Sequence, residues 1–273
     1  MVRVTTLMDN KFSEHKALVC KHGLSLFVET QNDSIIFDCG SGKDVIYNAK
    51  LLGIDISSAN HLVCSHSHYD HVGGFMDVLA EGFHGKFYSG KGFFERKYAI
   101  NEGKYTFLGA PFYESTLMKH NIPHLICDDV LEICSDCFLV TNFPRVYSFE
   151  EIPPRFVKDV NGRMQTDLFE DETSLVIKTE KGLIVIVGCS HPGILNMLCH
   201  IEKRFNESIY AVLGGTHLVE ADEQRVNVTL DKLLEIGIQF IGLSHCSGDD
   251  VQEHMKEKGM QNCHMSVGSV VVF

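Results

Sequence analysis

Four side chains that can bind a metal ion lie close together in the run His66-Ser67-His68-Tyr69-Asp70-His71. Two histidines that are two positions apart cannot share one face of a helix, where neighbours are three or four residues apart. They can converge from a loop, and the apolar run His61-Leu62-Val63-Cys64 before them predicts a strand that ends at this loop. The first two histidines of the run, and Asp70 with His71, could then bind two neighbouring metal ions.

Other segments place this motif in a recognisable context. His-x-His-x-Asp-His after an apolar strand resembles the metal-binding motif of the metallo-β-lactamase superfamily, and residues 24–40 resemble the family's opening hairpin and its Asp-x-Gly element. Segments 188–193, 214–218 and 244–248 resemble one branch, the 7,8-dihydropterin-6-yl-methyl-4-(β-D-ribofuranosyl)aminobenzene-5'-phosphate synthases. The resemblance covers roughly residues 20–90 and 170–273 and does not cover the middle well.

The resemblance implies an α/β fold, a four-layer αββα sandwich of the metallo-β-lactamase type. We expect one domain over residues 1–273. The residue pattern predicts strands at 24–28, 35–37, 61–64, 86–88, 131–134, 137–141, 175–178, 183–187, 209–213, 240–243 and 267–273, and helices at 41–52, 73–81, 193–205, 222–236 and 249–258. Because functional residues gather at strand ends in α/β folds, we expect the ends near residues 66, 191, 217 and 245 to meet at one edge.

The middle of the chain, about residues 90–170, is rich in aromatic residues and interrupted by prolines. We expect it to include a cap or insertion, with a loop around 145–170 that either shapes a substrate pocket or packs as a peripheral subdomain. Basic residues of this region could meet a phosphate group: Lys91, Arg96, Lys97, Lys104, Arg145, Arg155 and Arg163.

Carried over from the family, the resemblance implies a ligand set for two metal ions. The expected ligands are His66, His68, Asp70, His71, Cys189, His191 and His245. Relatives often carry an aspartate where this chain has Cys189, which would be a thiolate ligand or a close neighbour. The separate histidine of the common pattern is absent, and Asp171 or Glu172 could replace it. His217 is a further candidate, and Asp38 is expected to hold a ligating imidazole by its other nitrogen.

This site predicts a metal-dependent hydrolase or related transferase with a dinuclear centre. Metal-bound hydroxide would attack a small phosphorylated or heterocyclic substrate, such as a pterin, and Asp70 would also manage a catalytic proton. We expect zinc, with iron or manganese as alternatives. An iron-dependent oxidoreductase is a competing class, although its relatives usually carry Glu at the position of His68 and a fused flavodoxin domain. A metallo-nuclease is another.

The amino-acid composition limits the partners and the cellular compartment that we expect for this chain. The net charge of −12 argues against nucleic acid as a general partner, and no apolar run approaches the ~18 residues that a transmembrane helix needs. Ten cysteines without a secretory signal indicate a reducing cytoplasm rather than a disulfide framework. Cys134-x-x-Cys137 has the spacing of a redox or zinc pair, but no second pair lies near it in the chain, which argues against both.

Overall fold

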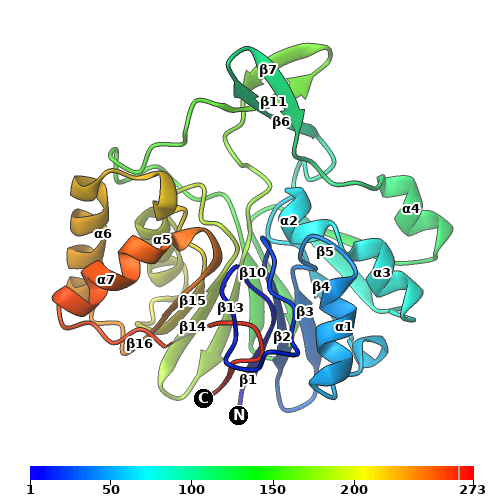
Figure 1. The fold of residues 1–273 in the computed structure, drawn as a ribbon, viewed down its shortest axis with the longest axis horizontal. Coiled ribbons are helices and arrows are strands. Elements are labelled where there is room, and N and C mark those ends of the chain that lie inside the picture. Colours follow the sequence, from blue (N-terminus) through cyan, green and yellow to red (C-terminus); the bar gives the residue numbers. More distant parts are fainter. Residues whose placement is uncertain (264) are drawn as a thin grey trace.

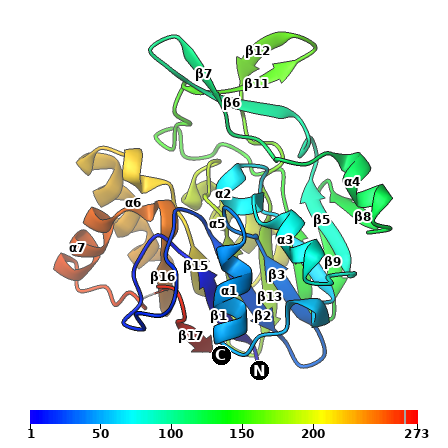
Figure 2. The ribbon, with the colours of Figure 1, turned by 45° about the vertical axis from the view of Figure 1, so that its right-hand side comes forward.

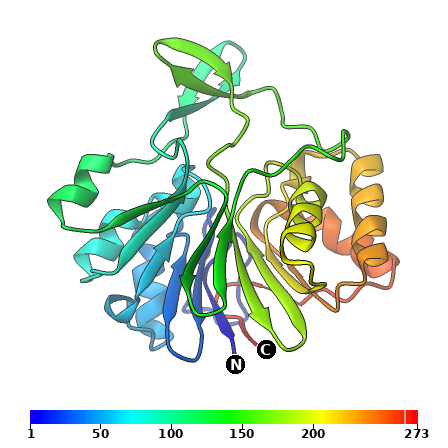
Figure 3. The ribbon, with the colours of Figure 1, turned by 180° about the vertical axis from the view of Figure 1, so that it is seen from behind.

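Strands that are apolar on both faces form the centre of the molecule, because each of two sheets is covered on both sides. In the strand Gly182–Val187, every residue after the glycine is buried. The computed structural model, which describes residues 1–263 and 265–273, packs the two sheets face to face with helices on both outer sides (Figure 1 and Figure 3). The predicted αββα sandwich is confirmed.

The first sheet has seven strands. Their order is β17 (Val270–Val272), β1 (Arg3–Met8), β2 (Ser25–Glu29), β3 (Ser34–Phe37), β4 (His61–Val63), β5 (Lys86–Gly90) and β8 (His124–Cys127). The last four run parallel to one another, so β3 and β4 both end at the same edge of the sheet.

The second sheet has six strands. Their order is β16 (Phe240–Leu243), β15 (Ile209–Gly214), β14 (Gly182–Val187), β13 (Ser174–Thr179), β10 (Cys137–Val140) and β9 (Val130–Cys134). Strands β14, β15 and β16 are parallel, and the apolar residues between the two sheets form a continuous cluster that includes Phe37, Val63, Leu175 and Ile186.

The helices divide between the outer faces. In Figure 1, α1 (Asp44–Leu51), α2 (Tyr69–Val72) and α3 (Phe75–Ala80) lie beside the first sheet, whereas α5 (Ile194–Phe205), α6 (Glu223–Ile236) and α7 (Asp249–Glu257) lie beside the second. The helix α3 is shorter than the predicted helix over 73–81, because Gly74 is its N-cap and not part of it. Gly74 also lies close to the Cys39 carbonyl, so that a Cβ at this position would be 2.3 Å from the carbonyl oxygen.

A small third sheet rises above one edge of the sandwich (Figure 1 and Figure 2). Its order is β12 (Arg163–Thr166), β11 (Phe156–Val160), β6 (Arg96–Asn101) and β7 (Lys104–Phe107), and α4 (Glu114–Lys119) follows β7 in the chain. The insertion therefore comes from two separate segments, and the part predicted as an insertion or cap loop around 145–170 contains the strands β11 and β12. Every residue of β7 and β12 is exposed, so these strands lack the apolar alternation that would reveal them.

Candidate metal centre

The carboxyl ends of strands from both large sheets meet at one edge of the sandwich. The ends of β3 and β4 supply Asp38 and the histidine motif, and the ends of β14, β15 and β16 supply Cys189 with His191, His217 and His245. All of these side chains except that of His217 are almost completely buried. Residues more than 170 positions apart in the chain are thereby brought within contact distance.

One imidazole of the motif is fixed from behind. Asp38, in a left-handed conformation at φ 59°, accepts hydrogen bonds from the Ser65 amide (2.7 Å) and the Ser65 hydroxyl (2.8 Å). Its Oδ2 also lies 2.6 Å from Nδ1 of His71. Because Nδ1–H of His71 donates its hydrogen bond to Asp38, the Nε2 atom faces the opposite direction and is the nitrogen that can bind a metal ion.

A second imidazole points its own lone pair at the same place. Nδ1 of His245 lies 3.0 Å from the Asn10 amide oxygen, which is an acceptor, so this nitrogen carries the proton. The two Nε2 atoms of His71 and His245 then face each other at 3.1 Å. Cys189 Sγ lies 3.1 Å from Nε2 of His71, and Asp70 Oδ2 lies 3.3 Å from Nε2 of His245. Only electron-pair donors surround this point, which we call the His71 position, and such a set fits a divalent cation.

A second group of donors lies beside the first and shares Cys189 with it. His66, His191 and Cys189 place their ligand atoms within 4.8 Å of one another, and we call this the His66 position. The Nε2 atom of His66 and both ring nitrogens of His191 are buried without a hydrogen-bond partner. His68 lies outside this group, but its ring centroid is 4.7 Å from that of His66 and its buried Nε2 is also unpartnered. Unpaired buried polar atoms are costly, so these four nitrogens fit a site that binds a cation.

The charges at the two positions match these roles. Burial lowers the pKa of His66, His68 and His191 well below the usual value, so all three rings are neutral and able to bind metal. Although burial opposes it, the field of Asp38 and Asp70 raises the pKa of His71 to about 9. A proton and a metal ion compete for the same nitrogen, so this negative field also attracts a cation.

The two carboxylates considered as replacements for the absent histidine are engaged elsewhere. Glu172 accepts hydrogen bonds from the amides of Ser190 (2.6 Å) and His191 (3.1 Å), and burial raises its pKa to about 8. Asp171 accepts from the Ser67 amide at 3.1 Å and pairs with the Lys97 ammonium. Both residues hold the loops that carry histidines, and neither belongs to a group of metal-capable atoms in the described chain.

Sequence reasoning missed several residues of this centre. His22 lies 3.1 Å from Asp70 Oδ2 and forms a metal-capable group with Asp70 and His245. Cys246 forms another group with Cys189 and His217. His22 stands alone before β2, far from any motif, so nothing in the sequence pointed to it. Cys246 directly follows His245 in a quoted segment, and its residue type was the only available signal.

The centre opens into a cavity of about 360 Å³. Tyr69, Phe156 and Arg155 line it together with the histidines. Arg155 is the only one of the predicted basic residues in this lining, and it pairs with Glu220. The prediction that Lys97 meets a phosphate is contradicted, because its ammonium is buried between Asp171 and Asp167, 3.0 Å from the latter.

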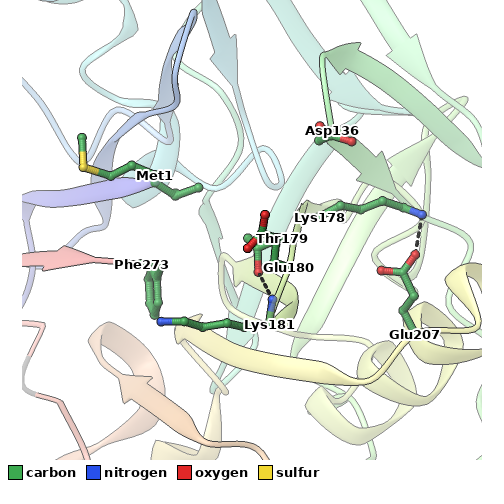
Figure 4. Close-up of a pocket in the computed structure, with 9 residues that line it drawn as sticks. Met1, Asp136, Lys178, Thr179, Glu180, Lys181, Glu207 and Phe273 are labelled. Carbon is green, nitrogen blue, oxygen red and sulfur yellow. Dashed lines mark hydrogen bonds and ion pairs between the residues drawn. The ribbon is translucent and has the colours of Figure 1, made fainter.

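A larger pocket lies near the two chain termini, at the opposite end of the sandwich (Figure 4). Lys178 on its wall is already paired with Glu207 at 2.6 Å. The pocket contains no histidine or cysteine, so its size does not make it the chemical centre.

The comparisons with known proteins agree with this geometry. A model of the metallo-β-lactamase superfamily matches residues 19–186, which is more than half of the chain. The chain belongs to the metallo-β-lactamase superfamily. Among the described residues, no helix combines the length and apolar character needed to cross a membrane.

Two proteins of Methanocaldococcus jannaschii are similar to this chain over most or all of its length. The first, 7,8-dihydropterin-6-methyl-4-(β-D-ribofuranosyl)-aminobenzene-5'-phosphate synthase, is 29% identical over 100% of this chain and 97% of its own length. The second, an uncharacterised protein, is 30% identical over 90% of both chains. A solved metal-dependent hydrolase of the β-lactamase superfamily is 28% identical, with a TM-score of 0.84 over 100% of this chain and 99% of its own. The resemblance stated from the sequence is confirmed.

Proposed function

We propose that this chain is a metal-dependent enzyme that holds two divalent cations, most simply zinc, at the His71 and His66 positions. The observation that carries the proposal is the opposed pair of Nε2 lone pairs on His71 and His245, with the Asp70 carboxylate and Cys189 sulfur beside them. A thiolate among imidazoles favours zinc over manganese. His68 completes the His66 position if its ring moves slightly toward the ion.

Two bound cations would supply a Lewis acid and a water of lowered pKa. The protein's own residues prepare the site for that chemistry. Asp70 stays ionised, because His71, His22 and His245 overcome the effect of burial and lower its pKa well below the usual range. It can therefore bind a cation and accept a hydrogen bond from an attacking water, which orients that water. Phe156 and Phe169 pack against the ring of His191 and exclude bulk water from that side.

The cavity favours a small, flat, phosphorylated substrate. Its volume suits a small molecule. Tyr69 and Phe156 offer aromatic surfaces, and the Arg155 guanidinium lies 4.0 Å from the Phe156 ring centroid, where it could meet a phosphate. The synthase of Methanocaldococcus jannaschii is named for a product with a dihydropterin, an aminobenzene ring and a phosphate. We therefore propose hydrolysis or group transfer on a pterin-like or phosphorylated ring compound.

The first test is elemental analysis of protein purified without added metal, beside the His66→Ala/His68→Ala variant. We expect at least two cations per chain in the unmodified protein, with loss of at least one in the variant. Phosphoesters and dihydropterin phosphate esters, with and without the aminobenzene ribosyl phosphate, are then the first substrates. Absence of metal from both proteins after incubation with zinc, iron or manganese would overturn the proposal. Bound iron with oxygen reduction would favour the oxidoreductase class instead, and cleavage of DNA or RNA the nuclease class.

A further inference from the structure

A second group of metal-capable side chains lies away from the strand ends. Its members, which we call the hairpin cluster, are Asp33, His61, Cys134 and Cys137. The ligand atoms of Asp33, His61 and Cys134 lie within 4.8 Å of one another. Cys137 faces Cys134 directly across the β9–β10 hairpin. The cluster therefore offers two sulfurs, an imidazole and a carboxylate.

The four residues come from both large sheets. Asp33 directly precedes β3 and His61 is the first residue of β4. These are the starts of the strands whose other ends carry the metal centre, so the hairpin cluster lies at the opposite end of the sandwich. No second cysteine pair adjoins Cys134 and Cys137 in the chain, and the remaining donors come instead from the facing sheet.

The histidine of the cluster is oriented as a metal ligand would be. Nδ1 of His61 lies 3.1 Å from the Tyr88 hydroxyl, which can donate a hydrogen bond to it or accept one from it. Nε2 lies 3.3 Å from the Asp33 carboxylate, which accepts the Nε2 hydrogen; a cation would replace that hydrogen between the ring and the carboxylate, and Nδ1–H would then donate to the Tyr88 hydroxyl. A ligating histidine usually donates its other ring N–H to an oxygen in this manner. His61 and Tyr88 are both buried, so the ring orientation is fixed by packing as well.

A cation could reach the cluster from solvent. Asp33 and Cys137 line a small surface cavity together with Ser135 and Asp136, the two residues of the hairpin turn. Asp136 also borders the pocket shown in Figure 4.

We propose that the hairpin cluster is a structural zinc site that joins the two large sheets at the end of the sandwich opposite the catalytic centre. Together with Cys137, the three grouped residues would supply four ligands, and a closed four-coordinate set is typical of structural rather than catalytic zinc. Zinc binding displaces the thiol protons into solvent and needs no oxidant. This site is independent of the function proposed above, since it shares no ligand with the His71 and His66 positions.

The test compares zinc content in full-length protein purified under reducing conditions. Replacing the pair as Cys134→Ser/Cys137→Ser should lower zinc by about one ion per chain. The same loss of about one zinc ion should occur when the cysteine pair is replaced in the His66→Ala/His68→Ala variant. When both histidines are present, the double cysteine variant should still turn over substrate. Cys199→Ser is the matched control, because Cys199 is half-buried on α5 and belongs to no metal-capable group in the described chain. Unchanged zinc content in the double cysteine variant would overturn the proposal.

A measurement on the unmodified chain covers the case in which that variant does not fold. Cys134 should resist alkylation in protein as purified and become reactive after chelation, with each modified cysteine located by peptide mass spectrometry. Cys127, buried on β8, should be unreactive in both states. Equal alkylation of Cys134 before and after chelation, or recovery of Cys134 and Cys137 as a disulfide from reduced protein, would contradict the zinc site.

Discussion

Asp38 illustrates how the metal centre is organised at the level of single residues. It touches neither metal position, yet it accepts three hydrogen bonds from Ser65 and His71 and thereby fixes which nitrogen of His71 faces the centre. The sequence predicted that Asp38 holds an imidazole by its other nitrogen, but it did not indicate which histidine. Asp38 was recognised because of the Asp-x-Gly element, whereas Asn10, which orients His245 in the same manner, has no motif of its own.

Replacing Asp38 should affect metal affinity more than folding. Asp38→Asn keeps the size of the side chain, and asparagine tolerates the left-handed backbone at φ 59°. The amide binds the His71 imidazole less strongly, so affinity should fall by roughly 10–100-fold. Competition with a chelator of known affinity measures the change. Asp128→Asn serves as the control, because Asp128 is exposed and belongs to no metal-capable group in the described chain. Intact metal content and activity in Asp38→Asn would show that the assignment is wrong.

At the scale of elements, a buried ion cluster attaches the third sheet to the metal centre. Lys97 on β6 is 1% exposed and pairs with Asp167 and Asp171, and its ammonium lies 4.5 Å from the Phe169 ring centroid. Asp171 in turn holds the Ser67 amide within the histidine motif. The insertion is therefore connected to the loop that it covers.

Removing the central cation of this cluster should destabilise the protein strongly. Lys97→Met leaves two buried carboxylates without their cation, and breaking a buried ion pair in this manner costs about 3–5 kcal/mol. Lys104→Met, on the exposed strand β7 of the same sheet, should change the free energy of unfolding by less than ~0.5 kcal/mol. Chemical denaturation measures both variants. Equal stability of the two would contradict the structural role of Lys97.

The start of α5 depends on another buried carboxylate. The two oxygens of Glu150 accept hydrogen bonds from the amides of Leu195 (2.9 Å) and Asn196 (2.8 Å), and burial raises the pKa of Glu150 to about 7. This helix follows directly after His191 and Gly193, so its first turn positions the loop that carries the histidine.

Glu150 predicts a pH dependence of stability. Its pKa rises from 4.5 in the unfolded chain to about 7 in the folded protein, so the folded state holds the proton more tightly. The associated stabilisation is complete below pH 4.5 and is lost as pH rises through 7. Glu150→Gln should remove this decline from the profile of unfolding free energy, and Glu151→Gln, an exposed neighbour, should retain it. Parallel profiles for Glu150→Gln and the unmodified protein would refute the prediction.

The elements themselves were largely predictable where strands are buried on both faces. The strand at Phe240–Leu243 matches its predicted bounds, and the parallel strands β14 and β15 differ from theirs by one residue at one end. The exposed strands β7 and β12 were not found, because a ribbon with solvent on both sides needs no apolar face. Strand β1 was also missed, since its threonines interrupt the apolar run although they are buried.

At the scale of the whole molecule, the centre forms only when distant parts of the chain meet. The Asp9 carboxylate accepts a hydrogen bond of 2.8 Å from the His245 amide, and Asn10 contacts the same histidine. The expectation that several strand ends share one edge followed from the fold class. The contacts of Asp9, Asn10 and His22 could not be predicted. These residues contact strand ends that lie far along the chain, and no local sequence pattern indicates such contacts.

Removing bound metal should therefore weaken the fold as a whole. Ligand donors from both sheets face one another at close range, and a cation that binds only the folded state stabilises it by mass action. Treatment with a chelator should lower the melting temperature, and added zinc should restore it. The His66→Ala/His68→Ala variant should respond less. A melting temperature that does not change on chelation would contradict this coupling.

Anomalous diffraction from crystals of the protein with its bound metal tests the central claim most directly. The account predicts two peaks at the strand ends. One would lie between Nε2 of His71, Nε2 of His245 and Asp70, and the other between His66 and His191, with Cys189 between the two peaks. Absence of both peaks from crystals grown with zinc, or ions bound only at sites remote from these side chains, would contradict it.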